Sequence, residues 1–235
     1  MGNRAAKDQL FEALASASRA LGTGRRAQLV DVLAQGERSV DELAREIGQS
    51  VANTSHHLKT LSAAGLVESR RAGNRAFYRL SSPLVEQAWD TLRALAAAQV
   101  EQFDALAAAY LGNRDEVPMM SREDLGARVA GGAVVLDVRP AAEYAAGHIP
   151  GALSTPPAHL QDLDGLLPLL PTGEVIAYCR GEFCVFADDA VRALLAAGRP
   201  AWRLEDGFPQ WRRAGLPVIT GPLPGILAPV AVTAR

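Results

Sequence analysis

The sequence predicts two domains, a mostly α-helical one followed by an α/β domain with a central parallel sheet. Its 235 residues, 49% of them hydrophobic, are enough for two ordinary domains that each bury a core. Helix-spaced apolar residues dominate the first half, whereas short apolar runs alternate with helical segments in the second half. This change of pattern places the domains at 1–111 and 118–220, with a linker at 112–117 and an extended tail at 221–235.

The composition excludes a disordered chain and a small disulfide-stapled protein. No apolar run approaches the roughly 20 residues that span a bilayer, and the first residues lack the hydrophobic stretch of a secretion signal. We therefore expect a cytoplasmic protein without membrane contact, in which the two cysteines, Cys179 and Cys184, are reduced thiols. We expect no cofactor and no bound metal.

The net charge of −2 conceals an uneven charge distribution. Residues 1–114 hold 14 Lys and Arg against 12 Asp and Glu, whereas residues 115–235 hold 10 against 14. Within residues 49–80, one acidic residue accompanies five basic ones, which are Lys59, Arg70, Arg71, Arg75 and Arg79. A local excess of positive charge is typical of a surface that binds nucleic acid.

Helices open the first domain. The apolar residues of segment 9–21 recur at the spacing of one helical face, and the glycines of segment 22–24 end that helix. A second helix follows and ends near Gly36. The third, over residues 40–47, begins with a Ser-Val-Asp-Glu capping box whose first residue is Ser39. The spacing therefore predicts three short, well-delimited helices before any strand.

A tight turn, a fourth helix and a hairpin come next. Ser50 caps the helix of residues 51–64, which begins directly after the turn. Two short strands, 66–71 and 75–80, then flank the turn-forming pair Gly73-Asn74, which predicts a β-hairpin. Two capped helices joined by a tight turn and followed by a basic hairpin describe a winged helix-turn-helix.

The second helix of this pair has a polar face that suits DNA. If Thr54, Leu58 and Leu61 are buried, a rotation of about 100° per residue puts short polar side chains on the opposite side. That side carries Ala52, Asn53, Ser55, His56 and Lys59. Ser50 and the helix N-terminus can hold a phosphate. The hairpin arginines expected on the DNA backbone or in the minor groove are Arg70, Arg71 and Arg75.

A long helix is predicted to close the first domain, from Pro83 to about Leu111. Its apolar residues form a wide stripe that needs a partner surface. These residues are Leu84, Val85, Ala88, Trp89, Leu92, Leu95, Ala96, Phe103, Leu106 and Tyr110.

Three segments of this domain closely resemble the ArsR family of bacterial repressors. They are the Ser-His-His-Leu-Lys-Thr-Leu run of 55–61, the Ala-Gly-Leu-Val run of 64–67 and the hairpin 70–78. The resemblance covers about residues 8–110. It implies a homodimer, joined through the first and last helices, that binds a palindromic operator in double-stranded DNA. Where metal-sensing members carry a Cys-x-Cys segment, this chain has Ser-Val-Asp at 39–41, so those metal sites are not expected.

The second domain is predicted from short buried strands separated by helices. Apolar runs lie at 134–138, 175–178 and 201–204, and a helix is expected over 185–197. Cys179 follows one of these strands directly. It therefore lies at the carboxyl end of a parallel strand, where open α/β sheets place their functional sites.

The segment from Cys179 onward is the candidate reactive loop. Its six residues are Cys179, Arg180, Gly181, Glu182, Phe183 and Cys184. Such a loop can turn its backbone N–H groups and the following helix N-terminus toward the first sulfur, which lowers the thiol pKa. Arg180 adds a cation and Gly181 permits the tight curvature. Asp137 and Arg139, after the preceding strand, are candidates either for orienting an anion or for fixing their own loop.

Two segments flank this loop in a recognisable order. Segment 136–152 contains Leu-Asp-Val-Arg-Pro and Gly-His-Ile-Pro-Gly-Ala, and segment 205–211 reads Glu-Asp-Gly-Phe-Pro-Gln-Trp. Together with the cysteine loop, over residues 118–220, they are similar to the rhodanese family. The resemblance implies a rhodanese-like α/β fold and a sulfurtransferase. In that chemistry the Cys179 thiolate takes the outer sulfur of thiosulfate or another sulfane sulfur donor and passes it to a thiol acceptor or to cyanide.

Three hypotheses for function follow. The first is a transcriptional repressor in which a Cys179 persulfide changes operator affinity and Cys184 acts as a resolving thiol. The second is primarily a sulfurtransferase whose DNA binding controls its own synthesis. The third is a sensor of arsenite or another thiophilic ion, captured by Cys179 and Cys184. Phosphoryl transfer is disfavoured because Val185, not an arginine, closes the loop.

Overall fold

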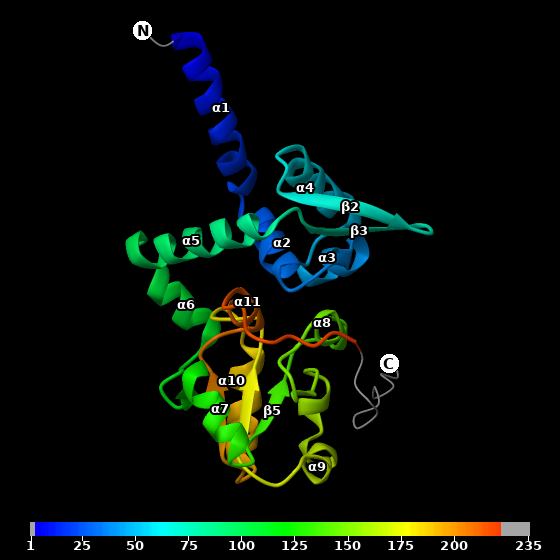
Figure 1. Cartoon of the computed structure of the whole chain (residues 1–235), viewed down its shortest axis with the longest axis vertical. Coiled ribbons are helices and arrows are strands. Elements are labelled where there is room, and N and C mark those ends of the chain that lie inside the picture. The colour runs from blue at the N-terminus through cyan, green and yellow to red at the C-terminus, as the bar shows by residue number, and fades with distance from the viewer. Residues whose placement is uncertain (1–2, 222–235) are drawn as a thin grey trace. The chain divides into compact units, whose positions relative to one another are not determined.

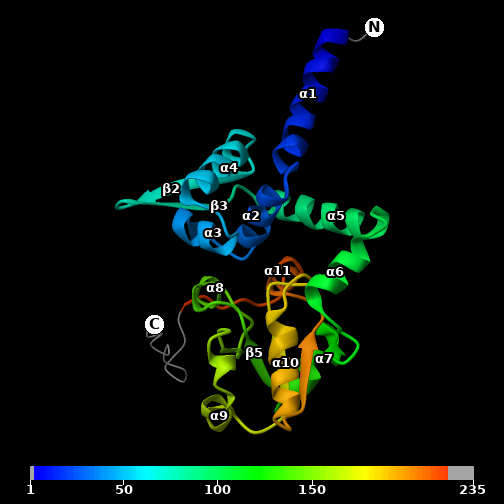
Figure 2. The ribbon, with the colours of Figure 1, turned by 180° about the vertical axis from the view of Figure 1, so that it is seen from behind.

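The structure is a computed structural model that describes residues 3–221. It contains two compact units, which divide between Glu101 and Gln102. Figure 1 labels the elements of both units, and Figure 2 shows the same ribbon from behind. Among the residues described, no helix is both long and apolar enough to cross a membrane.

The first unit is mainly helical. Its helices are α1 (Arg4–Leu21), α2 (Gly24–Ala34), α3 (Val40–Glu46), α4 (Val51–Ala63) and α5 (Pro83–Gln99). Its strands are β1 (Arg38–Ser39), β2 (Val67–Ala72) and β3 (Arg75–Leu80), in the order β1-β3-β2 with antiparallel pairing. Within this unit the β2–β3 hairpin projects past α3 and α4 (Figures 1 and 2).

The core of the first unit fixes the orientation of α4. Thr54, Leu58 and Leu61 are its buried residues, as the helical spacing predicts, and they pack with apolar side chains of α2 and α3. Burying one leucine side chain contributes about 1.5–3 kcal/mol, so this contact holds one face of α4 inward. The capping box of Ser39 and Glu42 is formed, and Ser50 caps α4. The opposite face of α4 is consequently left to solvent.

The second unit is built on a five-stranded parallel sheet with the order β4-β8-β7-β5-β6. The strands are β4 (Met119–Met120), β5 (Val134–Asp137), β6 (Leu153–Ser154), β7 (Val175–Tyr178) and β8 (Ala201–Leu204). The helices are α6 (Phe103–Leu111), α7 (Arg122–Ala130), α8 (Ala141–Ala146), α9 (Leu163–Leu166), α10 (Phe186–Ala196) and α11 (Phe208–Arg213). Short 3-10 turns occur at η1 (His159–Gln161) and η2 (Leu167–Leu169).

Alternating strand residues form two separate apolar layers in this unit. Leu136 and Ala177 face the layer that contains α9 and α10, whereas Val135 and Ile176 face the layer that contains α7, α8 and α11. Helices thus cover both faces of the sheet, as a buried parallel sheet requires. This arrangement brings the carboxyl ends of β5, β7 and β8 together at one edge.

The predicted helix from Pro83 to Leu111 is wrong as a single element. α5 ends at Gln99, and Val100 is extended with φ −90° and ψ 109° before α6 begins. The Phe103 ring contacts the Phe183 ring edge to face, with centroids 5.6 Å apart, and this contact belongs to the second unit. No glycine or proline marks the break, so the tertiary contacts of α6 override a continuous helical pattern.

The division between the units therefore differs from the predicted linker at 112–117. Arg192 Nη2 donates to the Asn113 carbonyl at 2.7 Å, which ties this segment to α10. Both α6 and the segment after it are parts of the second unit. The tail predicted for 221–235 lies, from residue 222 on, outside the described residues.

Candidate functional site

The outward face of α4 carries half of the predicted DNA-contacting side chains. Asn53, His56 and Lys59 are exposed, and Ser55 is half-buried. The Ser50 hydroxyl accepts a hydrogen bond from the Asn53 N–H at 3.2 Å, so it caps the helix end that is expected to meet a phosphate. These four α4 side chains share a surface that is free of apolar core residues.

The hairpin arginines differ in their surroundings. Arg71 and Arg75 are exposed near the hairpin turn. Arg70 instead donates from Nε to both Glu37 carboxylate oxygens, at 3.0 and 2.8 Å, and lies over the Phe77 ring. Its charge is therefore offset by Glu37, which the sequence could not reveal because the two residues are far apart in the chain. Among the contacts described, no acidic side chain pairs with Arg71 or Arg75. These two arginines remain the predicted DNA-contacting cations of the hairpin.

Cys179 lies directly after β7 and is 2% exposed. Its thiol is in hydrogen-bonding range of two backbone carbonyls, those of Gly181 at 3.7 Å and Cys184 at 3.6 Å. Both cysteines are free and buried. The loop therefore wraps around the first sulfur.

The two thiols have opposite pKa shifts. Burial raises the pKa of Cys179, but the hydrogen bond from Cys184, the charge of Arg203 and the N–H groups of Gly181 and Ala187 lower it to about 7. Ala187 lies in the first turn of α10, so the helix N-terminus does face the sulfur. The hydrogen bond to Cys179, together with burial, raises the pKa of Cys184. Near neutral pH a substantial fraction of Cys179 is therefore thiolate, while Cys184 remains a thiol.

Arg180 is paired with a buried carboxylate. Its Nε lies 3.0 and 3.2 Å from the carboxylate oxygens of buried Glu143, and its guanidinium lies over the Phe186 ring. The cation that lowers the Cys179 pKa is Arg203 of β8, which is 2% exposed and donates to the Gly181 carbonyl at 3.2 Å. The sequence shows Arg203 as a charge inside an otherwise apolar strand, but this signal does not identify Cys179 as its partner.

Asp137 and Arg139 fix the loop after β5. Both are fully buried, and the Arg139 guanidinium binds the Asp137 carboxylate at 2.6–3.2 Å. Arg139 also donates to the Gly147 carbonyl at 2.7 Å, and the Tyr178 hydroxyl donates to Asp137 at 2.6 Å. These contacts favour a role of Asp137 and Arg139 in fixing their own loop over a role in orienting an anion.

The segment 205–211 supports the cysteine loop from the next strand. An added Cβ at Gly207 would lie 2.3–2.5 Å from backbone atoms of Arg180 and Gly181. The Phe208 N–H donates to the Cys179 carbonyl at 3.0 Å. Glycine at this position therefore permits the loop to rest against the start of α11.

Comparison with known proteins assigns both units. Residues 121–214 match the family described as a rhodanese-like domain, and residues 23–69 match the family described as bacterial regulatory protein, arsR family. The HTH-type transcriptional regulator Rv0324 of Mycobacterium tuberculosis is 41% identical over 215 residues, which are 92% of this chain and 94% of that protein.

Shorter matches involve the first unit. The HTH-type transcriptional regulator KmtR of Mycobacterium tuberculosis is 42% identical over 69 residues, which are 29% of this chain and 53% of that protein. The homodimeric winged helix-turn-helix DNA-binding domain of Mb0332 from Mycobacterium bovis is 35% identical, with a TM-score of 0.40 over 43% of this chain and 94% of that domain.

The similarity to Rv0324 extends across both units, and each unit also matches its own family. The first unit supplies the winged helix-turn-helix of a DNA-binding regulator. The second unit has the rhodanese-like fold, which at the level of the family indicates sulfurtransferase-type activity. The chain belongs to the ArsR family of bacterial transcriptional regulators, and it joins a rhodanese-like domain to the DNA-binding domain.

Proposed function

We propose that this regulator accepts a sulfane sulfur on Cys179 and that the resulting persulfide changes its affinity for a palindromic operator. The observation that carries the proposal is the thiol pair of the cysteine loop. The Cys179 thiol has a pKa of about 7, faces the N-terminus of α10 at Ala187 and is hydrogen-bonded to a second thiol. A thiolate held by N–H groups is the nucleophile that such a transfer requires.

The proposed sulfur transfer needs only the donor and either an acceptor thiol or the second thiol of the loop. The Cys179 thiolate attacks the outer sulfur of thiosulfate, the S–S bond of the donor breaks, and sulfite leaves with the electron pair. A thiol acceptor can then remove the outer sulfur of the persulfide. Alternatively, Cys184 attacks the inner sulfur, forms a Cys179–Cys184 disulfide, and releases hydrosulfide, which carries away the thiol proton.

In the Cys184→Ser variant, the reaction is expected to stop at the Cys179 persulfide, before any disulfide forms. Wild-type protein treated with thiosulfate or polysulfide should give a bridged Cys179–Cys184 product. Trypsin cleaves after Arg180, so mass spectrometry will find the bridge as two linked peptides. In Cys184→Ser, the Cys179 peptide should be heavier by one sulfur atom and unlinked. An open persulfide as the final product of wild type, or a bridged product that persists in the variant, contradicts the resolving role.

Coupling to DNA binding is supported by the contacts of α6. Its first residue, Phe103, packs against Phe183 of the cysteine loop. Only residues 100–102 separate α6 from α5, the last helix of the first unit. A change in the loop can therefore act on the helix that leads into the DNA-binding unit. A preference of about 1–3 kcal/mol between two arrangements would suffice for regulation.

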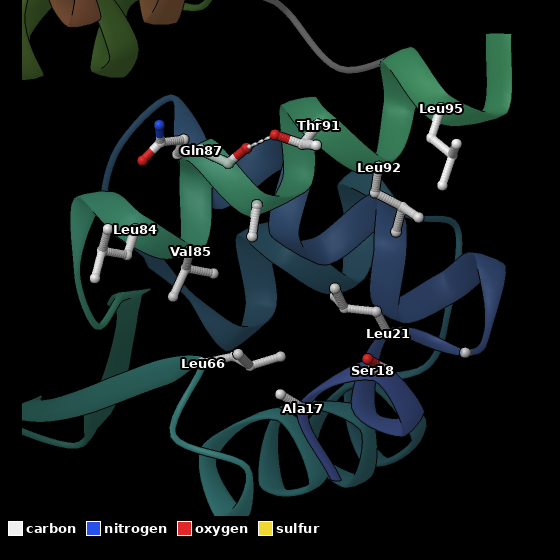
Figure 3. Close-up of a pocket in the computed structure, with 12 residues that line it drawn as sticks. Ala17, Ser18, Leu21, Leu66, Leu84, Val85, Gln87, Thr91, Leu92 and Leu95 are labelled. Atoms are coloured by element: carbon white, nitrogen blue, oxygen red, sulfur yellow. Dashed lines mark hydrogen bonds between the residues drawn. The ribbon is translucent and has the colours of Figure 1, made fainter. Parts of the chain in front are cut away.

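A homodimer through α1 and α5 is supported by their exposed apolar residues. On α1, Leu10, Phe11 and Leu14 are 58–61% exposed, although they recur on one helical face. A groove of about 740 Å³ lies between α1 and α5, and Figure 3 shows Leu21, Leu84 and Leu92 among its lining side chains. A second copy that contributes α1 would cover both surfaces and present two α4 helices to a palindrome.

Lys59 is expected to contribute to operator affinity through its charge. The Lys59→Gln variant should bind more weakly and should lower the slope of log affinity against log salt by about 1, because one fewer phosphate contact releases counterions. Operator titration by fluorescence anisotropy at several salt concentrations measures both. The control, Arg213→Gln, removes one positive charge from the exposed end of α11 in the second unit. An equal change of slope in both variants contradicts a specific contact by Lys59.

The proposed function is tested by an operator-shift titration across a salt series. The titration uses wild type and Cys179→Ser, each with and without thiosulfate or polysulfide. Two chains are expected for each palindrome. A donor-dependent change of affinity in wild type alone supports the proposal.

A further inference from the structure

Two backbone carbonyls link the Cys179 sulfur to two arginines, the buried Arg203 and the partly buried Arg114. The thiol lies 3.7 Å from the Gly181 oxygen and 3.6 Å from the Cys184 oxygen. The Gly181 oxygen also accepts a hydrogen bond from Arg203 Nη2 at 3.2 Å, and the Cys184 oxygen accepts one from Arg114 Nη2 at 3.3 Å. Each oxygen therefore contacts both the sulfur and a guanidinium.

One carboxylate joins the two guanidiniums. Asp188, on α10, is fully buried, and its Oδ2 accepts hydrogen bonds from Arg114 Nε at 2.8 Å and Nη2 at 2.6 Å. Its Oδ1 lies 2.9 Å from Arg203 Nε. Arg203 comes from β8 and Arg114 from the segment after α6, so Asp188 connects two parts of the second unit behind the cysteine loop.

The charges of this cluster match an anionic sulfur. Two guanidiniums and one carboxylate leave an excess of positive charge, which a Cys179 thiolate or persulfide anion balances. A neutral thiol instead donates its proton to the same carbonyls that the arginines bind. Because an anionic sulfur cannot donate, its formation leaves the Cys184 carbonyl to Arg114 and the Gly181 carbonyl to Arg203 and the Cys184 N–H.

We propose that Arg203, Asp188 and Arg114 are positioning residues that form a charge relay, which favours the anionic sulfur of Cys179 and couples its charge state to segment 112–117. The effect of these residues on the Cys179 thiol does not depend on the proposed function. Only the regulatory role of segment 112–117 rests on that function. Arg203 acts through space on the sulfur. Arg114 acts through Asp188 and the Cys184 carbonyl, and it also anchors the segment that follows α6.

Arg192 provides a matched control for Arg114. It binds the same segment, since its Nη2 donates to the Asn113 carbonyl at 2.7 Å, and it pairs with Asp189 at 3.3 Å. None of the contacts described for it involves the cysteine loop or Asp188. Loss of Arg192 therefore weakens the anchoring of the segment without altering the charges around Cys179.

The test is the pH profile of Cys179 alkylation by iodoacetamide in the full chain. Trypsin cleavage after Arg180 places Cys179 and Cys184 on different peptides, so mass spectrometry follows Cys179 alone. Wild type should show a midpoint near pH 7. Arg203→Met should raise it by about 1 pH unit or more, because an opposite charge close to the thiolate is lost.

Variants of Arg114 test the relay itself and avoid replacing a fully buried side chain. Arg114→Gln should raise the midpoint by less than Arg203→Met, Arg114→Lys should restore most of the wild-type value, and Arg192→Gln should leave it unchanged. An unchanged midpoint in Arg114→Gln, or an equal rise in Arg192→Gln, overturns the relay.

The alkylation assay uses neither DNA nor a sulfur donor. If the alkylation midpoints shift as expected but no persulfide forms, the relay is supported and the proposed function is contradicted. If the persulfide forms but the midpoints do not shift, the relay is contradicted and the proposed function is not.

Discussion

Replacing Cys179 with serine is expected to abolish sulfur loading and to make operator affinity indifferent to thiosulfate and polysulfide. A serine hydroxyl is not ionised near neutral pH and forms no persulfide, so the first step of the chemistry is lost. In wild type, a coupling of about 1–3 kcal/mol would change operator affinity about 5- to 150-fold on addition of the donor. Operator titration with and without donor measures this change, and the mass of the Cys179 peptide reports loading.

A control for this variant lies outside the cysteine loop. Glu123 of α7 is exposed, and Glu123→Gln retains both thiols, so it should keep the donor response. If Cys179→Ser still responds to the donor, sensing does not occur at this cysteine. If wild type transfers sulfur in steady state while its operator binding ignores the persulfide, the protein is primarily an enzyme and its DNA binding serves another purpose.

Features that depend on neighbouring residues were predictable from the sequence. The buried face of α4 follows from helical spacing at Thr54, Leu58 and Leu61, and the capping box at Ser39 follows from residues three positions apart. The position of Cys179 after a buried strand follows from the apolar run before it. In each case the physical cause lies within about one or two turns of chain.

Features that depend on contacts between distant segments were not predictable. Glu143 binds Arg180, and Arg203 is the cation that lowers the Cys179 pKa, although Arg180 is adjacent in sequence. Asp188 binds Arg114, which lies before the first strand of the sheet. The carboxyl ends of β7 and β8 and the N-terminus of α10 meet only when the sheet forms. The ionisation of the sulfur therefore depends on the tertiary fold, through Arg203 and Ala187, as well as on the loop, through Cys184 and Gly181.

Gly207→Ala is expected to displace the cysteine loop and slow sulfur loading by about 100-fold, as a misplacement of about 1 Å in a reactive site can do. Gly207 has φ −90° and ψ 175°, which alanine adopts without strain, so backbone preference does not oppose the change. The obstacle is steric, because the new Cβ would lie 2.3–2.5 Å from backbone atoms of Arg180 and Gly181. Backbone atoms cannot rotate aside as a flexible side chain can, and overpacking of this kind costs about 1–3 kcal/mol.

The displacement would also weaken the hydrogen bond from the Phe208 N–H to the Cys179 carbonyl, which helps to hold the loop at the edge of the sheet. Rates of persulfide formation and the midpoint of denaturant unfolding measure the two effects. The control is Gly126→Ala, within α7, where an added Cβ meets no atom within 4 Å. Helix propensity should make that control more stable by about 0.5–1 kcal/mol. If the Gly207→Ala variant forms the persulfide at the wild-type rate, the loop is held in place by its own residues and not by segment 205–211.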